Sequence, residues 1–144
     1  MKNFNYFRCI PVLMLLLVAS LSACEKNKEI VAPDAATTVA GQYTYSELNL
    51  NGKTLPASQT DLKGTVSLTR ETATSVTMVL NIRMKSDNSE FLVDNLDETE
   101  VVDLGSGLYS LRLEGQEFAQ IKDKKLTIKG VDTGGVSFSI AATK

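Results

Sequence analysis

The chain has 144 residues, of which 15 are basic, 17 are acidic and none is histidine. A net charge of −2 argues against the basic surface that a nucleic-acid-binding domain needs, so we expect no nucleic-acid partner. Histidine is the usual general base near neutral pH and the commonest ligand of transition metals. Because histidine is missing and no glycine-rich phosphate loop is present, we expect a protein that is not an enzyme and holds no metal or other cofactor.

The first residues have the layout of a secretory signal. Lys2 and Arg8 precede an apolar run over 10–19, which is shorter than the ~20 residues that a membrane-spanning helix needs. The run leads into the tetrapeptide Leu-Ser-Ala-Cys, which ends at Cys24 and resembles the lipobox of bacterial lipoproteins. The resemblance implies a signal peptide over 1–23 and acyl chains such as palmitate on Cys24. It also implies a membrane-anchored place in the bacterial cell envelope, at the outer membrane, with the choice between its periplasmic and surface faces open.

The residues after this cysteine have the composition of a tether. Charge, one proline and small residues, without a periodic apolar face, predict a lipidated tether over 24–40 ahead of one domain over 41–144. About 16 extended residues reach roughly 50 Å, so the domain can stand clear of a bilayer. The run Glu-Lys-Asn-Lys-Glu at 25–29 resembles the signal that sends some Bacteroidetes lipoproteins to the outer face. The alternative is an ordinary solvated tether.

From residue 41 onward, apolar side chains recur at every second position. Val76, Met78, Leu80 and Ile82 alternate in this way, which is typical of half-buried antiparallel strands. The expected strands cover 41–50, 65–72, 74–84, 89–95, 99–104, 108–114, 117–122, 125–131 and 135–142. Short strands joined by tight turns favour an all-β fold, a small antiparallel up-and-down barrel of about eight strands, with a sandwich as the alternative. The one helix we expect is a short one around 58–63.

The tripeptide Gly41-Gln42-Tyr43 resembles the Gly-x-Trp that opens lipocalin and calycin barrels. In that family the aromatic ring closes the barrel base beneath an arginine near the last strand. Here tyrosine replaces tryptophan, and Lys144 is the only late basic residue available in place of the arginine. The resemblance implies a lipocalin-like barrel such as those of small Bacteroidetes lipoproteins. The alternative is a strand start with an ordinary core tyrosine.

An acidic cluster spans the junction of two expected strands, at Asp94, Asp97, Glu98, Glu100 and Asp103. We interpret it as the solvated tip of a hairpin. The alternative is a Ca²⁺ site, because hard cations prefer several carboxylate ligands.

A second charged cluster holds Lys122, Lys124, Lys125 and Lys129 in one expected hairpin. Lysines often protect an exposed sheet edge against aggregation, and we favour that role here. The alternative is an acidic partner.

Two functions remain open for such a barrel. The first is a non-catalytic binding module for a small apolar or amphipathic ligand, and the second is a partner-docking lipoprotein whose barrel is filled by its own side chains. Any ligand should enter at the end opposite Gly41, where the longest connection, 51–64, is expected. We therefore expect Leu55, Leu62 and Met78 near a ligand. We also expect a monomer, held at the membrane by the acyl chains on Cys24, whose partner is a small apolar ligand or an envelope protein.

Overall fold

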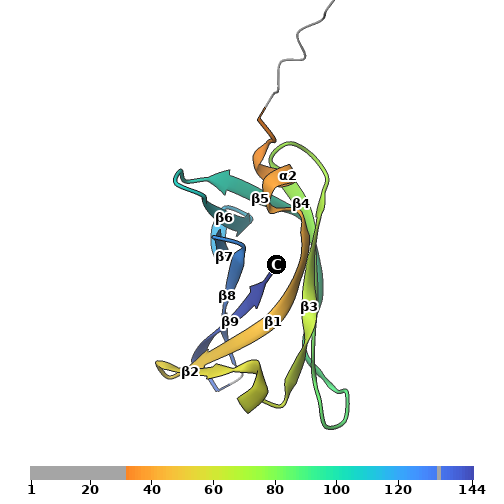
Figure 1. Cartoon of the computed structure of the whole chain (residues 1–144), viewed down its shortest axis with the longest axis vertical. Helices are drawn as coiled ribbons and strands as arrows, with labels where there is room; N and C mark the ends of the chain where they lie inside the picture. The colour runs from red at the N-terminus through yellow and green to blue at the C-terminus, as the bar shows by residue number, and fades with distance from the viewer. Residues whose placement is uncertain (1–31, 133) are drawn as a thin grey trace, which may run out of the picture. The chain divides into compact units, whose positions relative to one another are not determined.

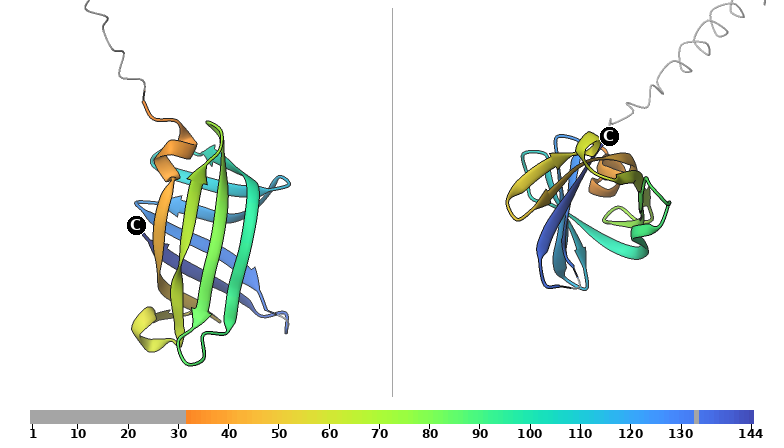
Figure 2. Two further views of the ribbon diagram at one scale, coloured as in Figure 1. Left: turned by 90° about the vertical axis from the view of Figure 1, so that its right-hand side faces the viewer. Right: turned by 90° about the horizontal axis from the view of Figure 1, so that it is seen from below.

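Alternating apolar and polar side chains produce nine antiparallel strands in residues 32–132 and 134–144, the part of the chain that this computed structural model describes. The strands are β1 (Gly41–Leu50), β2 (Lys53–Pro56), β3 (Leu62–Arg70), β4 (Ser75–Met84), β5 (Glu90–Asp103), β6 (Leu108–Leu113), β7 (Gln116–Lys122), β8 (Lys125–Val131) and β9 (Ser137–Thr143). Each pairs with the next in the order β2-β1-β3-β4-β5-β6-β7-β8-β9, and β1 also pairs with β9. Eight strands thus form a closed up-and-down barrel, shown in Figure 1 and Figure 2, which confirms the predicted fold class.

The predicted long connection over 51–64 contains a strand. Asn51 and Gly52 adopt positive φ angles of 52° and 77°, as a tight hairpin turn requires, and β2 follows directly. β2 pairs with the second half of β1, whereas β3 pairs with the first half. After β2, a single 3-10 turn, η1 (Ala57–Gln59), takes the place of the short helix expected around 58–63.

The acidic cluster lies in one continuous strand, not at a hairpin tip. β5 runs through the residues that were predicted to separate two strands, so that interpretation is wrong. A β-bulge absorbs the extra residue, because Glu98 adopts a φ of 53° and the pairing with β4 shifts register nearby. The hydroxyl of the fully buried Thr99 donates to the carbonyl of Leu96 at 3.1 Å and ties the bulge together.

A short helix, α2 (Ala35–Val39), packs against the barrel within the stretch predicted to be a tether. Ala36 and Val39 are fully buried, and the Ala36 amide donates to the carbonyl of Ala73 at 3.2 Å. The compact unit accordingly begins at Pro33, eight residues before the predicted boundary at 41. The other N-terminal predictions, namely the signal over 1–23, the lipidation of Cys24 and the tether up to residue 31, lie outside the described residues.

Side chains fill most of the barrel interior. The core cluster consists of residues no more than 5% exposed, among them Tyr43, Tyr45, Val66, Leu68, Val76, Met78, Leu80, Ile82, Val101, Leu111, Ile121, Leu126, Ile128 and Ile140. Such low exposure shows that these side chains pack closely against one another. At ~25 cal/mol per Å² of buried apolar surface, this cluster supplies most of the driving force for folding.

Successive turns lie at opposite ends of the barrel because consecutive strands run in opposite directions. The helix end carries α2 and the turns after β3, β5 and β7, and the other end, which we call the mouth end, carries the turns after β1, β4, β6 and β8. Figure 1 shows α2 at the top of the barrel and β2 at the bottom.

Candidate functional site

A set of contacts around Tyr43 holds the helix end together. Its hydroxyl donates to the carbonyl of Val39 at 2.7 Å, and burial raises the pKa of Tyr43 to about 12. The Lys144 ammonium lies 5.9 Å from the centroid of the Tyr43 ring and donates to the carbonyl of Ala40 at 2.5 Å. Gly41 leaves room for this lysine, since a Cβ there would lie 2.7 Å from Lys144 Cε. Lys144, the only late basic residue, therefore lies over the ring of Tyr43.

The mouth end instead opens into an apolar pocket with a volume of about 500 Å³. It is lined by Leu48, Leu50, Phe91, Leu92, Val131, Asp132 and Phe138. Three of the apolar side chains remain substantially exposed, with 37% for Leu50, 41% for Phe91 and 64% for Val131. Covering these exposed apolar side chains would remove them from water and would therefore be favourable.

A register shift in β1 places its leucines in this pocket. Tyr43 and Tyr45 face the core, and continued alternation would send Leu48 and Leu50 to the outer face. The pairing with β9 shifts by one residue between Tyr45 and Glu47, and that shift returns both leucines to the inner side of the rim.

The Phe138 ring lies against a glycine, Gly130, on the neighbouring strand β8. Gly130 pairs directly with Phe138, and a Cβ on Gly130 would lie only 2.5 Å from Phe138 Cζ. The Phe138 ring is 5.9 Å from the Phe91 ring, with an angle of 59° between the ring planes. This tilted contact joins β9 to the start of β5 across the mouth.

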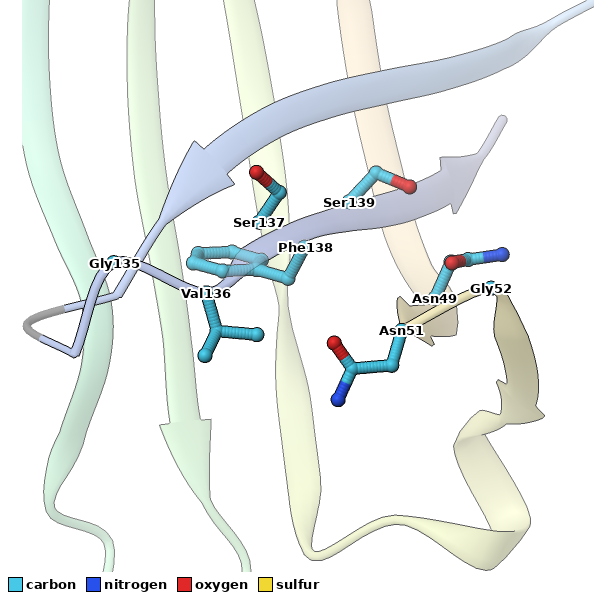
Figure 3. Close-up of a pocket in the computed structure, with 8 residues that line it drawn as sticks. All are labelled: Asn49, Asn51, Gly52, Gly135, Val136, Ser137, Phe138 and Ser139. Carbon is cyan, nitrogen blue, oxygen red and sulfur yellow. The ribbon is translucent and has the colours of Figure 1, made fainter.

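A polar groove of about 580 Å³ adjoins the apolar pocket and shares Phe138 with it. Its lining consists of Asn49, Asn51, Gly52, Gly135, Val136, Ser137, Phe138 and Ser139, none of which is charged. Figure 3 shows Ser137 and Ser139 on one side of β9 and the Phe138 ring on the other. The rim therefore carries hydroxyls on one side of β9 and an aromatic ring on the other.

The residues predicted to line a ligand site lie elsewhere. Leu62 and Met78 are buried in the core, and Leu55 is half-buried in β2. None of the three lines the apolar pocket, the polar groove or a smaller cavity of about 260 Å³ beside Tyr43. The apolar pocket nonetheless lies at the end opposite Gly41.

Sequence reasoning missed the side chains that form the mouth. Leu50 and Val131 end their strands, and Phe91 and Phe138 lie near the beginning of theirs. In a meander, the end of one descending strand and the start of the next ascending strand fall at the same rim. Large apolar residues beside the turns of the mouth end were therefore the sequence signal for this site.

The charged clusters are not metal sites or edge protection. Within residues 32–132 and 134–144, no three acidic or cysteine side chains gather closely enough to hold a metal ion. Of the clustered lysines, Lys125 pairs with Glu47 at 2.7 Å and Lys129 with Glu117 at 3.3 Å. Because β8 is paired on both sides, with β7 and with β9, the edge-protecting role predicted for this hairpin is wrong.

Comparison of the chain with protein-family models, curated protein sequences and solved structures finds no match. Within the described residues, no helix has the length and apolar character needed to cross a membrane. A functional assignment therefore depends on the geometry of the two barrel ends and on the sequence that precedes the barrel.

Proposed function

We propose that this protein is a lipid-anchored bacterial envelope lipoprotein whose lipocalin-like barrel binds, without catalysis, a small amphipathic ligand at its mouth end. The observation that carries the proposal is the pairing of the exposed apolar pocket with an uncharged polar groove across a shared side chain, Phe138. An apolar part of the ligand lies in the pocket, and its polar part lies in the groove.

The apolar half has the size and composition of a ligand site. Pockets that hold small molecules typically have volumes of about 300–1,000 Å³ and mostly apolar linings, and this one has about 500 Å³. A short acyl chain or a ring system placed there would cover Leu50, Phe91 and Val131. Each buried CH₂ group contributes ~0.8 kcal/mol, so a chain of a few carbons is enough for measurable affinity.

The polar half favours a neutral head group. Asn49, Asn51, Ser137 and Ser139 offer amide and hydroxyl groups, which both donate and accept hydrogen bonds. The single charged residue that lines either cavity is Asp132, and it is acidic. A ligand with hydroxyl or amide groups therefore suits the rim better than a carboxylate or a phosphate.

The membrane anchor would leave this mouth accessible. The chain enters the barrel unit at Pro33, next to α2 at the helix end, and the mouth lies at the other end of the barrel. The chain that follows Cys24 therefore joins the barrel unit at the end that does not carry the mouth. Two or more acyl chains are needed for stable anchoring, which matches the lipidation that the lipobox resemblance implies.

Ligand binding is tested with the chain from residue 24 onward carrying Cys24→Ser, which removes the lipid but keeps the rest. Octyl glucoside below its micelle concentration is compared by calorimetry with octanoate and with glucose. We expect saturable one-to-one binding of octyl glucoside, weaker binding of octanoate and no binding of glucose. Val131→Asp should weaken octyl glucoside binding about tenfold or more, because it places a charge in the apolar pocket. The matched control is Val79→Asp, on the outer face of β4, which should leave the affinity unchanged.

Anchoring has its own experiment. Full-length protein produced in a bacterial host should fractionate with membranes and carry acyl chains on Cys24. Cys24→Ser should release it and block the normal cleavage. A mature N-terminus without acyl chains, measured by intact mass spectrometry, would contradict the anchor.

The filled interior favours a second function, docking to an envelope protein through the same mouth. The residues of the core cluster are no more than 5% exposed, and the cavity beside Tyr43 has a volume of only about 260 Å³, which is below the ~300 Å³ of a typical ligand pocket. In that case, the exposed rim side chains, Phe91 and Val131, would cover an apolar patch of a partner. No binding of any of the three probes, together with retention of a specific envelope protein by the wild type but not by Val131→Asp, would favour docking.

A further inference from the structure

The barrel closes with one long gap in its hydrogen bonding, along β5. β5 pairs with β4 from Glu90 to Glu100 but with β6 only over residues 100–103. Within the described residues, no strand pairs with the other side of residues 90–98. Figure 2 shows this lower part of β5 at the margin of the sheet formed by β1, β3 and β4. An unpaired strand edge is a template for another strand.

The backbone groups of this edge are directed away from β4. The Asn95 amide donates to the carboxylate of Asp94 at 2.8 Å, so this amide is not used in the ladder with β4. Because backbone groups alternate in direction along a strand, those of Val93 share the direction of those of Asn95. The free edge ends at Glu98, where the bulge turns the strand toward β6.

Charge along the edge has one sign. Asp94, Asp97, Glu98 and Glu100 are exposed, and β5 contains no basic residue. Among the described residues, the one ion pair that β5 makes is between Glu90 and Arg83, at 3.2 Å. A second copy of this chain would place acids opposite acids, which is unfavourable for directly opposed residues in a sheet. The charge therefore selects against self-association and in favour of a basic strand.

Apolar side chains accompany these acids. Val93 and Phe91 are exposed, while Leu92 and Leu96 are half-buried against the core. We propose that the edge of β5 from residue 91 to residue 98 accepts an extended segment of a partner protein that alternates apolar and basic residues. Main-chain hydrogen bonds to Val93 give affinity, a carbonyl of the partner replaces the exposed Asp94 carboxylate at the Asn95 amide, and the carboxylates select the charge. The edge shares Phe91 and Leu92 with the lining of the apolar pocket, whereas Val93 and Asn95 line neither the pocket nor the polar groove, so the amides of these two residues report on the edge alone.

The experiment uses the Cys24→Ser chain from residue 24 onward and an acetylated nine-residue peptide of alternating valine and lysine. Backbone amide exchange is followed by NMR. In the free protein, the amides of Val93 and Asn95 should exchange quickly. The Val-Lys peptide should slow them about tenfold or more, and a Val-Glu peptide should leave them unchanged. Added salt should weaken the binding, because the edge is exposed.

Two variants separate strand addition from simple charge attraction. Val93→Pro removes an amide hydrogen of the open edge and should abolish protection of Asn95, although the acids remain. If that variant does not fold, Asp97→Lys serves instead, and it should reduce the affinity for the Val-Lys peptide severalfold while raising that for the Val-Glu peptide.

Three results would overturn the proposal. One is slow exchange of Val93 and Asn95 in the free chain that disappears when residues 25–31 are deleted, because the edge would then be covered by the protein itself. Another is equal protection by both peptides. The third is binding of the Val-Lys peptide without any protection of these two amides.

Discussion

The Lys144 ammonium lies over the ring of Tyr43, 5.9 Å from its centroid, so the end of β9 is fastened to the beginning of β1 where the barrel closes. Lys144→Ala removes this cation–π contact and the hydrogen bond to Ala40, and should lower the free energy of unfolding by about 1 kcal/mol in urea denaturation. Lys144→Arg should retain most of the stability. The control is Lys63→Ala, an exposed lysine without an ion pair among the described residues. Equal losses at Lys144 and Lys63 would show that the contact contributes nothing.

The hydroxyl of Tyr43 makes stability depend on alkaline pH. Burial raises the pKa of Tyr43 to about 12, whereas an unfolded tyrosine titrates near pH ~10. Between these values the unfolded chain loses a proton that the folded chain keeps, so stability is present below pH ~10 and falls as pH rises toward the folded pKa. Tyr43→Phe should reduce this fall in stability. At neutral pH the substitution should cost about 1 kcal/mol, because the hydrogen bond to the carbonyl of Val39 is lost. Thermal unfolding of both proteins, measured about every half pH unit between roughly pH 8 and pH 11, gives both effects as changes in melting temperature. Burial also raises the pKa of Tyr45, so part of the loss of stability at alkaline pH should remain in Tyr43→Phe. An identical pH dependence of stability in wild type and Tyr43→Phe would show that Tyr43 does not cause it.

Acid should loosen α2 from the barrel. The Arg70 guanidinium, at 2.8 Å, and the Thr37 amide hold the pKa of Asp34 well below its usual range. Because the folded pKa is depressed, the stabilisation is present above the unfolded pKa of ~3.9 and is lost as pH falls toward the folded value. Asp34→Asn should make α2 exchange its amides faster at neutral pH and remove most of the extra acid sensitivity. Hydrogen exchange of residues 35–40 measures this, with Asp123→Asn as the control at the same end of the barrel. Unchanged exchange in Asp34→Asn would show that the helix is held by Ala36 and Val39 alone.

The absence of a side chain at Gly130 positions Phe138. A Cβ at residue 130 would lie 2.5 Å from the ring, so Gly130→Ala must displace the ring from its place beside Phe91. We expect this variant to fold, and to bind octyl glucoside about tenfold more weakly, since a shift of the ring alters both the pocket and the groove. Thr127→Ala, on the same strand but away from the mouth, should bind normally. Full affinity in Gly130→Ala would exclude Phe138 as the shared wall of the site.

The strands with strong alternation and clear turns were predictable from the sequence. β1 has the expected bounds, 41–50, because Gly41 begins it and the Asn51-Gly52 turn ends it. β5 was divided in the prediction because Asp97 and Glu98 have the composition of a turn, whereas buried Thr99 holds them in a bulge. α2 was missed because five residues are too few to show a helical period.

The candidate site was predictable only as a location. The end of the barrel opposite Gly41 follows from strand order, but the side chains at that end depend on two features that no period reveals. One is the register shift after Tyr45, which turns Leu48 and Leu50 inward. The other is the pairing of Gly130 with Phe138, which brings the ring toward Phe91. Met78 faces the barrel interior, as its alternation predicts, but it is fully buried in the core and does not reach the mouth.

The most direct test of ligand binding at the mouth is an NMR titration of the Cys24→Ser chain with octyl glucoside, following methyl and aromatic signals. We expect saturable shifts of Leu50, Phe91, Val131 and Phe138, with the methyl group of Met78 unchanged, because Met78 is fully buried and does not line the pocket. Shifts that do not saturate, or shifts at Met78 with none at Phe91 and Phe138, would contradict it.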